Sequence, residues 1–375
     1  MTTQSDNKKH TYFIAGGGTG GHIYPAIAIA NALKTDEKTE KIYYIGNPDN
    51  LEKKIAERED FDFLNVEISG MPRKADLKLL SWSYHLFIST VKCIHYIFKY
   101  KPDLVFGTGG YVSAPALFAA IITNTPFMIH DCDAIPGIVS KTVAPFAKKI
   151  SVAFEKSQEF LKSDNVICNG NPIRDDFLKL NKKDARKILE LENKLTIVVM
   201  GGSQGAQQIN SAIANSVKLL FEKYDIQILH QTGAKNYDKT IQELEKIYPE
   251  YKENKNYRIQ PYFDDMYVPL MASDIAISRS GSLSLSEICI SKLASVLIPY
   301  PFAAADHQRK NAREMEANGA SVYLENDNCN SENLCKILEE LINNSEKLAA
   351  LQNNSAKLAK PDATKNIIKQ IYQLV

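Results

Sequence analysis

Residues 11–22 read TYFIAGGGTGGH, and residues 196–207 read TIVVMGGSQGAQ. Each stretch is a short apolar run that leads directly into a glycine-rich turn, which residues of helical spacing follow. Short apolar runs that end in such turns are typical of buried strands in a parallel sheet with crossover helices. Because the same pattern opens both halves of the chain, the sequence predicts two doubly wound α/β domains.

The rest of the chain supports this two-domain organisation. A chain of 375 residues is longer than one hydrophobic core usually serves. The Asn171-Pro172 step suits a linker, because the residue before a proline avoids the helical region. The predicted strands are 11–15, 42–46, 63–68, 104–107, 127–130 and 150–153 in the first half, and 195–200, 226–231, 257–261, 275–278, 295–299 and 321–324 in the second.

Composition and charge exclude several classes of function. Lysine plus arginine (45) nearly balances aspartate plus glutamate (44), so no overall field favours nucleic acid. The six cysteines are scattered without a C-x-x-C pair, which indicates buried thiols rather than disulfides or a metal site. Residues 1–10 lack the apolar core of a signal peptide, and Pro115 interrupts the apolar stretch 111–129. We therefore expect a cytoplasmic protein with at most peripheral membrane contact.

The first glycine turn, residues 16–21, fits G-x-G-x-x-G and precedes a helix that we expect to begin near His22. Glycine lets a ligand approach the backbone closely, and free N–H groups at the start of a helix attract anions. A nicotinamide dinucleotide is a weak alternative ligand. The second strand ends at 43–47 without an acidic residue to bind a ribose hydroxyl.

Two further strand–turn–helix segments lie in the second half. In 201–205, Ser203 either helps to cradle a diphosphate or caps the following helix. In 278–287, Glu287 suits a ribose diol, because one carboxylate can accept hydrogen bonds from both hydroxyls. The competing interpretation is a capping box, in which Ser284 and Glu287 bond to the backbone at a helix start. These residues alone leave both pairs of alternatives open.

Five motifs, in order along the chain, resemble one known family. They are GGGTGGH (16–22), GNPIR (170–174), GGSQGA (201–206), SRSGSLSLSEI (278–288) and DHQRKNA (306–312). Together they resemble the MurG family of N-acetylglucosaminyl transferases, which make lipid II in peptidoglycan synthesis. The resemblance implies the GT-B glycosyltransferase architecture, with two facing Rossmann-like domains and a last helix that returns to the first domain. The expected domains are 1–170 plus 358–375, which binds the acceptor and the membrane, and 171–357, which binds the UDP-sugar donor.

The resemblance implies a donor site in the second half. Comparison of the motif positions with those of the family assigns Ser203 to the donor diphosphate and Glu287 to the ribose hydroxyls. It assigns the backbone of Phe263 to the uracil. Gln308 matches a position near sugar hydroxyls. Arg174 also matches a donor-contacting position, and its alternative role is a salt bridge in the domain linker. The residues expected to hold the nucleotide together with Glu287 are Ser282, Leu283, Ser284, Leu285 and Ser286.

The resemblance also implies an acceptor site in the first glycine turn. Thr19, Gly20 and Gly21 match positions near the acceptor diphosphate and the transferred sugar. We expect His22 to be the catalytic residue, a general base for the acceptor hydroxyl. A helix N-terminus disfavours the imidazolium form, so His22 is expected to be neutral and able to accept a proton. The alternative is that His22 shapes the loop without proton transfer.

One motif departs from the family pattern. Where the family usually has H-E-x-N, residues 130–133 read HDCD. An ionised Asp133 can accept hydrogen bonds but cannot donate one as asparagine does, so we expect it to bind hydroxyl donors of the sugar. Asp131 and Asp133 also imitate a metal-binding D-x-D pair. We expect no metal, because helix N-termini in this fold can stabilise the leaving diphosphate instead.

Residues 71–101 are the candidate membrane contact. The segment carries six lysines or arginines against one acid, Asp76, and apolar side chains including Trp82 interleave with the first three cations. An apolar surface that is flanked by cations is attracted to an anionic leaflet. The alternative is a long helix that packs these apolar side chains onto the sheet.

The predicted function follows from the resemblance. We expect transfer of N-acetylglucosamine from UDP-N-acetylglucosamine, with inversion at the anomeric carbon, to polyprenyl-linked lipid I (undecaprenyl-pyrophosphoryl-N-acetylmuramyl-pentapeptide). The product is lipid II, formed at the cytoplasmic face of the membrane. Neither a cofactor nor a nucleic acid partner is expected. The alternatives are another glycolipid or secondary-metabolite transferase of this fold, a hydrolysing sugar-nucleotide epimerase, and a non-catalytic nucleotide-binding scaffold.

Overall fold

The computed structural model describes residues 8–72, 77–202, 204–303 and 306–375. The chain divides into two compact units: unit 1 comprises Met1–Ile173 with Asp362–Val375, and unit 2 comprises Arg174–Pro361. The sequence places these boundaries after residues 170 and 357. Asn171 belongs to unit 1 because its side chain bonds to His130 there, with Nε2 of His130 3.0 Å from Oδ1 of Asn171.

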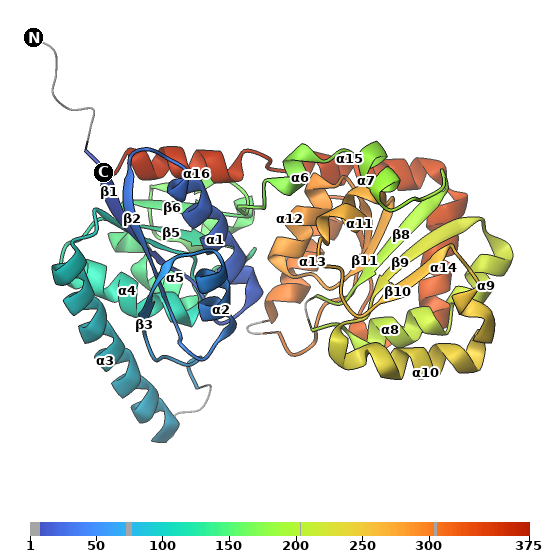
Figure 1. The fold of residues 1–375 in the computed structure, drawn as a ribbon, viewed down its shortest axis with the longest axis horizontal. Coiled ribbons are helices and arrows are strands. Elements are labelled where there is room, and N and C mark those ends of the chain that lie inside the picture. Colours follow the sequence, from blue (N-terminus) through green and yellow to red (C-terminus); the bar gives the residue numbers. More distant parts are fainter. Residues whose placement is uncertain (1–7, 73–76, 203, 304–305) are drawn as a thin grey trace, which may run out of the picture. The chain divides into compact units, whose positions relative to one another are not determined.

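Unit 1 is built on a parallel sheet (Figure 1). Its strands are β1 (His10–Ala15), β2 (Thr39–Gly46), β3 (Asp62–Asn65), β4 (Leu104–Gly107), β5 (Phe127–Asp131), β6 (Lys149–Val152) and β7 (Val166–Cys168). Their order is β3-β2-β1-β4-β5-β6-β7, which reverses between β1 and β4, where Ala15 pairs with Gly107. Ligands of open parallel sheets bind beyond the carboxyl ends of the strands at such a reversal.

Both faces of the unit 1 sheet are buried. Alternate side chains of β1 point to opposite faces, so Phe13 lies in one hydrophobic cluster and Ile14 in the other. The helices are α1 (Gly20–Lys34), α2 (Leu51–Arg58), α3 (Leu77–Tyr100), α4 (Gly110–Ile122), α5 (Ile138–Val143) and α16 (Ala363–Tyr372). The cluster around Phe13 includes residues of α3, α4 and α5, and the cluster around Ile14 includes residues of α1, α2 and α16. Figure 1 shows the C-terminal α16 beside α1.

Unit 2 repeats this plan. Its strands are β8 (Leu195–Met200), β9 (Ile226–Gln231), β10 (Tyr257–Gln260), β11 (Ile275–Ser278), β12 (Ala294–Leu297) and β13 (Ser321–Tyr323). Its helices are α6 (Asp176–Lys179), α7 (Lys182–Ile188), α8 (Gln207–Ala214), α9 (Val217–Lys223), α10 (Tyr237–Ile247), α11 (Tyr267–Ala272), α12 (Ser282–Ile290), α13 (His307–Ala317), α14 (Ser331–Asn343) and α15 (Ser345–Leu358). The parallel order β10-β9-β8-β11-β12-β13 reverses between β8 and β11, where Met200 pairs with Ser278.

The predicted strands are all present, with ends that differ by at most three residues. The sequence analysis missed β7, because this strand has three residues at the sheet edge and Ile167 within it is 41% exposed. The apolar stretch 111–129, which includes the predicted strand 127–130, forms α4 and β5. Within the described residues, none of the helices combines the length and the apolar character that a membrane crossing requires.

Candidate active site

The first glycine turn lies at the strand-order reversal of unit 1, between β1 and α1. The helix begins at Gly20, slightly before the predicted start near His22, and the exposed Thr19 is its N-cap. The carbonyl oxygen of Thr19 accepts hydrogen bonds from the N–H groups of His22 and Ile23, both at 3.1 Å. The first N–H groups of a helix lack partners within the helix, and here they belong to Gly20 and Gly21. An anion can therefore bind at this turn.

The loop after β4 determines the tautomer of His22. Its Nδ1 lies 2.8 Å from the carbonyl oxygen of Thr108. Because a carbonyl oxygen can only accept, Nδ1 carries the proton of this hydrogen bond. The Thr108 hydroxyl donates in return to the carbonyl oxygen of His22, at 2.7 Å. In the neutral ring Nε2 therefore holds the lone pair, which is the form that a general base requires.

The sequence analysis missed the residues that make room for the His22 ring. Gly110 has a φ of 71°, and a Cβ there would lie 2.9 Å from Cδ2 of His22. Gly109 has a φ of 72°, and its Cβ would lie 3.2 Å from Oγ of Ser140. Both positions favour glycine by conformation, and Gly110 also by space. The available signal was the GTGG run at 107–110, a second glycine turn after a neighbouring strand.

Asp131 supports a loop. It is 2% exposed, its Oδ1 accepts from the N–H of Asp133, and its Oδ2 accepts from the N–H of Gly137, both at 3.2 Å. Burial, together with the nearby charge of Asp133, raises the pKa of Asp131. Within the part of the chain that the structure describes, no three His, Cys, Asp or Glu side chains are grouped to hold a metal ion. The geometry gives the metal-binding interpretation of Asp131 and Asp133 no support.

His130 has a structural role at the boundary of unit 1. Its Nδ1 lies 2.9 Å from Oγ of Ser151, and its Nε2 lies 3.0 Å from Oδ1 of Asn171. Burial lowers the pKa of His130 to about 4, so the ring is neutral at pH 7. The asparagine of the GNPIR motif is therefore held by a buried histidine.

The second glycine turn, at the start of unit 2, requires glycine by conformation and by space. Gly202 and Gly205 have φ values of 80° and 73°, and a Cβ on Gly205 would lie 1.9 Å from the carbonyl oxygen of Thr232. Ser203, the predicted diphosphate contact, lies outside the described residues. The N-cap of the following helix, α8, is Ala206.

The third motif forms the start of α12. This helix begins at Ser282, with Gly281 as its N-cap, so Ser284 already lies inside the helix. The capping-box interpretation of Ser284 and Glu287 is therefore wrong, because it requires Ser284 to precede the first turn. The Leu285 side chain is 1% exposed and belongs to the core. The side chains of Leu283, Ser284, Ser286 and Glu287 are partly exposed, and Ser282 is buried.

Glu287 and Arg174 influence each other within unit 2. Burial raises the pKa of Glu287 to about 7, and the positive charge of Arg174 acts in the opposite direction. The guanidinium carbon of Arg174 lies 5.8 Å from the ring centres of Phe177 and Tyr267. Arg174 thus lies over two aromatic rings. Among the described residues no salt bridge of Arg174, its alternative role, is found.

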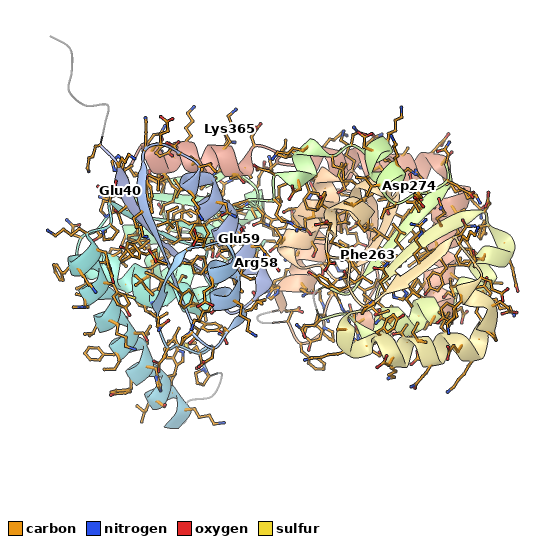
Figure 2. The ribbon with its side chains drawn as sticks, viewed as in Figure 1. Glu40, Arg58, Glu59, Phe263, Asp274 and Lys365 are labelled. Atoms are coloured by element: carbon orange, nitrogen blue, oxygen red, sulfur yellow. The ribbon has the colours of Figure 1, made fainter. Side chains whose placement is uncertain are left out.

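Two further predicted donor contacts are fixed by local hydrogen bonds. Oε1 of Gln308 accepts from the N–H of Tyr300 at 3.0 Å, so its side-chain NH2 is the group that can donate to a sugar hydroxyl. Phe263, which is labelled in Figure 2, is 8% exposed, and its N–H donates to Oε1 of Gln231 at 2.8 Å. Gln231, at the end of β9, is a supporting residue that the sequence analysis did not identify.

The long helix α3 presents an apolar stripe to solvent. Its exposed members are Leu80 (69%), Tyr84 (64%), Phe87 (64%), Ile88 (36%) and Val91 (47%). Their spacing places them on one face of the helix. Trp82 does not belong to this stripe, because it packs against the unit 1 core and its Nε1 donates to the carbonyl oxygen of Ser69 at 2.8 Å. Arg73, Lys74 and Asp76 of the candidate membrane segment lie outside the described residues.

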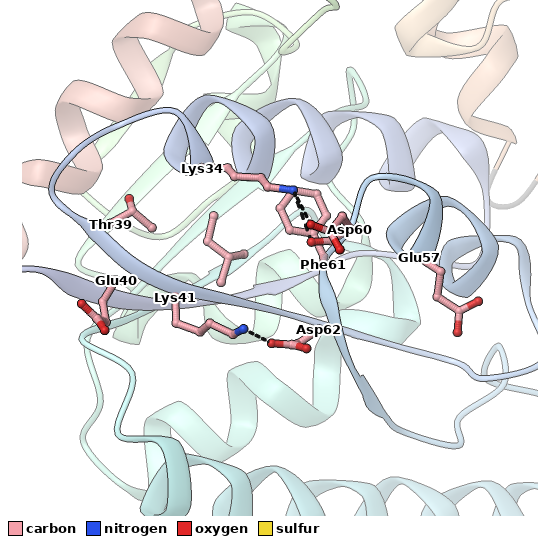
Figure 3. A pocket seen from close by; sticks show the side chains of 9 residues that line it. Lys34, Thr39, Glu40, Lys41, Glu57, Asp60, Phe61 and Asp62 are labelled. Carbon is pink, nitrogen blue, oxygen red and sulfur yellow. Dashed lines mark hydrogen bonds and ion pairs between the residues drawn. The ribbon is translucent and has the colours of Figure 1, made fainter.

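A surface pocket of about 440 Å³ in unit 1 lies away from the first glycine turn (Figure 3). Residues at the starts of β2 and β3 line this pocket. The first glycine turn, by contrast, follows the end of β1 in the same parallel sheet. Nζ of Lys34 lies 3.4 Å from Oδ2 of Asp60, and Lys41 pairs with Asp62. Since these charges already bond to one another, we do not assign the active site to this pocket.

Two family models together match most of the chain. The glycosyltransferase family 28 N-terminal domain matches residues 12–152, and the glycosyltransferase family 28 C-terminal domain matches residues 196–367. The chain belongs to glycosyltransferase family 28. The first family 28 domain contains the turn with His22, and the second contains the turn with Gly205 and the start of α12.

Similar proteins match nearly the whole chain. A protein of Desulforamulus reducens is 36% identical over 96% of this chain and 98% of its own length, and one of Thermoanaerobacter sp. (strain X514) is 37% identical over 97% and 99%. Both are named UDP-N-acetylglucosamine--N-acetylmuramyl-(pentapeptide) pyrophosphoryl-undecaprenol N-acetylglucosamine transferase. The crystal structure of Acinetobacter baumannii MurG has a TM-score of 0.77 and 24% identity, over 97% of this chain and 99% of its own. The resemblance to MurG and the GT-B fold class with two Rossmann-like domains are confirmed.

Proposed function

We propose that this chain transfers N-acetylglucosamine from UDP-N-acetylglucosamine to polyprenyl-linked lipid I and so forms lipid II. Relatives that match its whole length carry the name of this reaction. The observation that supports the proposal at the level of chemistry is the tautomer of His22. Its hydrogen bond to Thr108 keeps the proton on Nδ1, so a basic nitrogen is available beside the free N–H groups of a helix start.

In unit 1, His22 accepts the proton of the acceptor hydroxyl as that oxygen attacks the anomeric carbon. Direct attack inverts the configuration at this carbon, and UDP leaves. Thr19 and the N–H groups of Gly20 and Gly21 hold the acceptor diphosphate at the start of α1. Asp133, which is partly exposed, accepts a hydrogen bond from a sugar hydroxyl.

In unit 2, Glu287 binds the ribose hydroxyls, and the first turn of α12 (Ser282, Leu283, Ser284, Leu285 and Ser286) binds the nucleotide around it. Leu285 contributes only its backbone, because its side chain is buried. Phe263 meets the uracil through its backbone, and Ser203 and Arg174 contact the donor. The side-chain NH2 of Gln308 donates to a sugar hydroxyl. The N–H groups of the second glycine turn stabilise the leaving UDP without a metal or another cofactor.

The acceptor brings the enzyme to the cytoplasmic face of the membrane as a peripheral protein. The stripe of α3 formed by Leu80, Tyr84, Phe87, Ile88 and Val91 is the membrane-docking surface. Exposed apolar patches of this kind are uncommon on soluble monomers unless they contact a partner or a membrane. Lysines of the same helix, Lys78, Lys92 and Lys99, favour an anionic leaflet.

A product assay tests this function against its alternatives. The protein is incubated with UDP-N-acetylglucosamine and a short-chain lipid I analogue, or with other glycolipid acceptors, and the products are identified by mass spectrometry. We expect lipid-linked disaccharide and UDP only with the lipid I analogue. Free sugar released without an acceptor would indicate a hydrolysing epimerase, and transfer to a different glycolipid would reassign the acceptor. UDP binding without any product would indicate the scaffold.

A further inference from the structure

A buried carboxylate lies beneath the first glycine turn, and the proposed reaction does not use it. Glu52, in the first turn of α2, is 0% exposed. Its Oε2 accepts from the N–H of Gly18 at 3.4 Å, and its Oε1 accepts from the N–H of Asn47 at 3.2 Å. Oε1 also accepts from Nδ2 of Asn50 at 3.4 Å. These donors are uncharged amide groups, so oriented dipoles stabilise the carboxylate.

Glu52 accepts hydrogen bonds from N–H groups and lies at the start of a helix. A negative charge in the first turn of a helix is stabilised by the helix dipole, and Glu52 is the second residue of α2. Every bond that it receives comes from an N–H group, which a carboxylate oxygen accepts without a proton of its own. Removal of an acceptor would leave partly buried N–H groups without this partner, which is unfavourable.

The glycine turn is shaped around this carboxylate. A Cβ on Gly17 would lie 2.6 Å from Oε1 of Glu52, and a Cβ on Gly46 would lie 2.8 Å from its Cγ. Gly18 has a φ of 84°, and its Cβ would lie 2.7 Å from Cε1 of Tyr111. The glycines at 17 and 46 therefore leave the space that the carboxylate fills, and Gly18 adopts the left-handed conformation while its N–H points to Glu52.

A tyrosine holds the same turn from its other end. The hydroxyl of Tyr44 donates to the carbonyl oxygen of Gly16 at 2.7 Å. Burial, and to a smaller extent the charge of Glu52, raises the pKa of Tyr44, so its hydroxyl stays protonated and continues to donate. The turn is thus held inward at Gly16 and at Gly18. The next residue, Thr19, is exposed and is the N-cap of α1.

We propose that Glu52 is a positioning residue for the acceptor site. By drawing the Gly18 N–H inward, it fixes the turn so that the N–H groups of Gly20 and Gly21 are presented to the acceptor diphosphate next to His22. This inference rests on the proposed function, because it takes the acceptor to bind at this turn. Glu52 itself touches no substrate and acts through the backbone.

The test compares Glu52→Gln with the matched control Glu57→Gln. Both glutamates lie on α2, but Glu57 is exposed and pairs only at 3.8 Å with Lys53. The amide of a glutamine cannot accept at both of its atoms, so E52Q leaves Gly18 or Asn47 without its acceptor. The readouts are acceptor KM and kcat at saturating donor, the Kd of UDP, and hydrogen–deuterium exchange of peptides covering residues 12–24.

We expect E52Q to raise the acceptor KM about tenfold, which corresponds to ~1.4 kcal/mol, and to accelerate exchange in the turn. The Kd of UDP stays within twofold, and E57Q behaves like the wild type. An unchanged acceptor KM, or an equal loss of UDP affinity, would overturn the positioning role. If E52Q does not fold, the variant Gly17→Ala tests the positioning role instead, because its methyl group displaces the Glu52 carboxylate without removing it. An unchanged acceptor KM in this variant would again overturn the role.

The exchange measurement separates this inference from the proposed function. If the wild type transfers no sugar to the lipid acceptor, the proposed function fails. Exchange in residues 12–24 then still reports whether Glu52 holds the turn, and an unchanged rate in E52Q contradicts the inference on its own.

Discussion

His22 obtains its chemical form from Thr108, which lies 86 positions further along the chain. The place of His22 at the start of α1 does not decide which nitrogen carries the proton. The carbonyl oxygen of Thr108 decides this, because it can only accept a hydrogen bond. Gly110 leaves the space in which the ring takes this orientation. A general base at this position therefore depends on two adjacent loops of unit 1.

The variant His22→Asn separates proton transfer from loop shape. The side-chain NH2 of an asparagine can replace Nδ1–H as the donor to Thr108, but it offers no basic nitrogen. We expect kcat to fall by about 10²- to 10⁴-fold, the usual contribution of a general base. The Kd of UDP, measured by calorimetry, should stay unchanged, since the proposed UDP site lies in unit 2. A kcat within threefold of the wild type would reduce His22 to a loop-shaping residue.

The raised pKa of Glu287 predicts pH-dependent nucleotide binding. Burial raises this pKa to about 7, so the carboxyl is protonated in the free protein below that value and ionised above it. An ionised carboxylate accepts from both ribose hydroxyls, so affinity for uridine should weaken as the pH falls below about 7 and level off above it. Uridine is the probe because it has no phosphate that titrates in this range.

Glu287→Gln is the matched control for this dependence. Its amide does not titrate, so uridine affinity should be weaker at pH 8 and nearly independent of pH between 6 and 8. If the wild type and E287Q show the same pH profile, Glu287 is not the ribose ligand.

Residues that belong to a recognisable motif could be predicted from the sequence. Residues that act through a contact distant in sequence could not. Glu287 and His22 lie in helices that directly follow a strand and a glycine-containing turn, so the sequence pattern named them as candidates. Glu52 acts on Gly18 across 34 positions, and nothing in the local pattern around it distinguishes it from a surface glutamate. Gln231, at the end of β9, likewise supports Phe263 in the loop after β10.

Elements were predicted better than their ends. Strands such as β4, β8, β9 and β11 are buried on both faces, so their apolar runs stand out and the predicted bounds agree with the structure. The start of α12 was less clear, because Ser284 and Glu287 fit a capping box and only the structure places the cap at Gly281. The edge strand β7 has too little apolar pattern to be recognised.

The exposed stripe of α3 predicts a membrane-binding phenotype. Phe87→Glu replaces a ring that is 64% exposed with a charge that an anionic leaflet repels. We expect binding to vesicles with anionic lipids, measured by sedimentation, to fall at least tenfold, because burial of such a side chain contributes about 1.5–3 kcal/mol. Leu219→Glu, at an exposed leucine on α9 of unit 2, is the control. Equal vesicle binding by F87E and the wild type would remove α3 from the docking surface.

At the scale of the whole chain, the C-terminal helix completes the first unit. Ile367 and Ile371 of α16 are fully buried in the cluster that contains β1 and α1. Gln370 and Asn169 also exchange hydrogen bonds, at 3.1 and 3.3 Å, across 201 positions. The sequence shows an amphipathic final helix, but its place against unit 1 came from the family resemblance, since periodicity does not identify the surface that a helix covers.

This packing predicts that the two units lose stability separately. Ile371→Ala should lower the unfolding free energy of unit 1 by about 2–5 kcal/mol, the usual cost of such a truncation in a core. The proposed UDP site lies in unit 2, so calorimetry with UDP should show one transition shifted by the mutation and another shifted by the ligand. A mutation that shifts the UDP-sensitive transition equally would contradict this division.

Transfer of labelled N-acetylglucosamine from its UDP donor to a short-chain lipid I analogue, with and without chelator, tests the central claim most directly. Asp131 is occupied by backbone N–H groups, and N–H groups of the glycine turns can stabilise the leaving diphosphate. We therefore predict that label enters the lipid fraction at rates within about threefold of each other in the two conditions, as expected if the turns supply the stabilisation. Measurable UDP binding with no label in the lipid fraction would contradict the proposed function, and transfer abolished by chelator would contradict the metal-free mechanism.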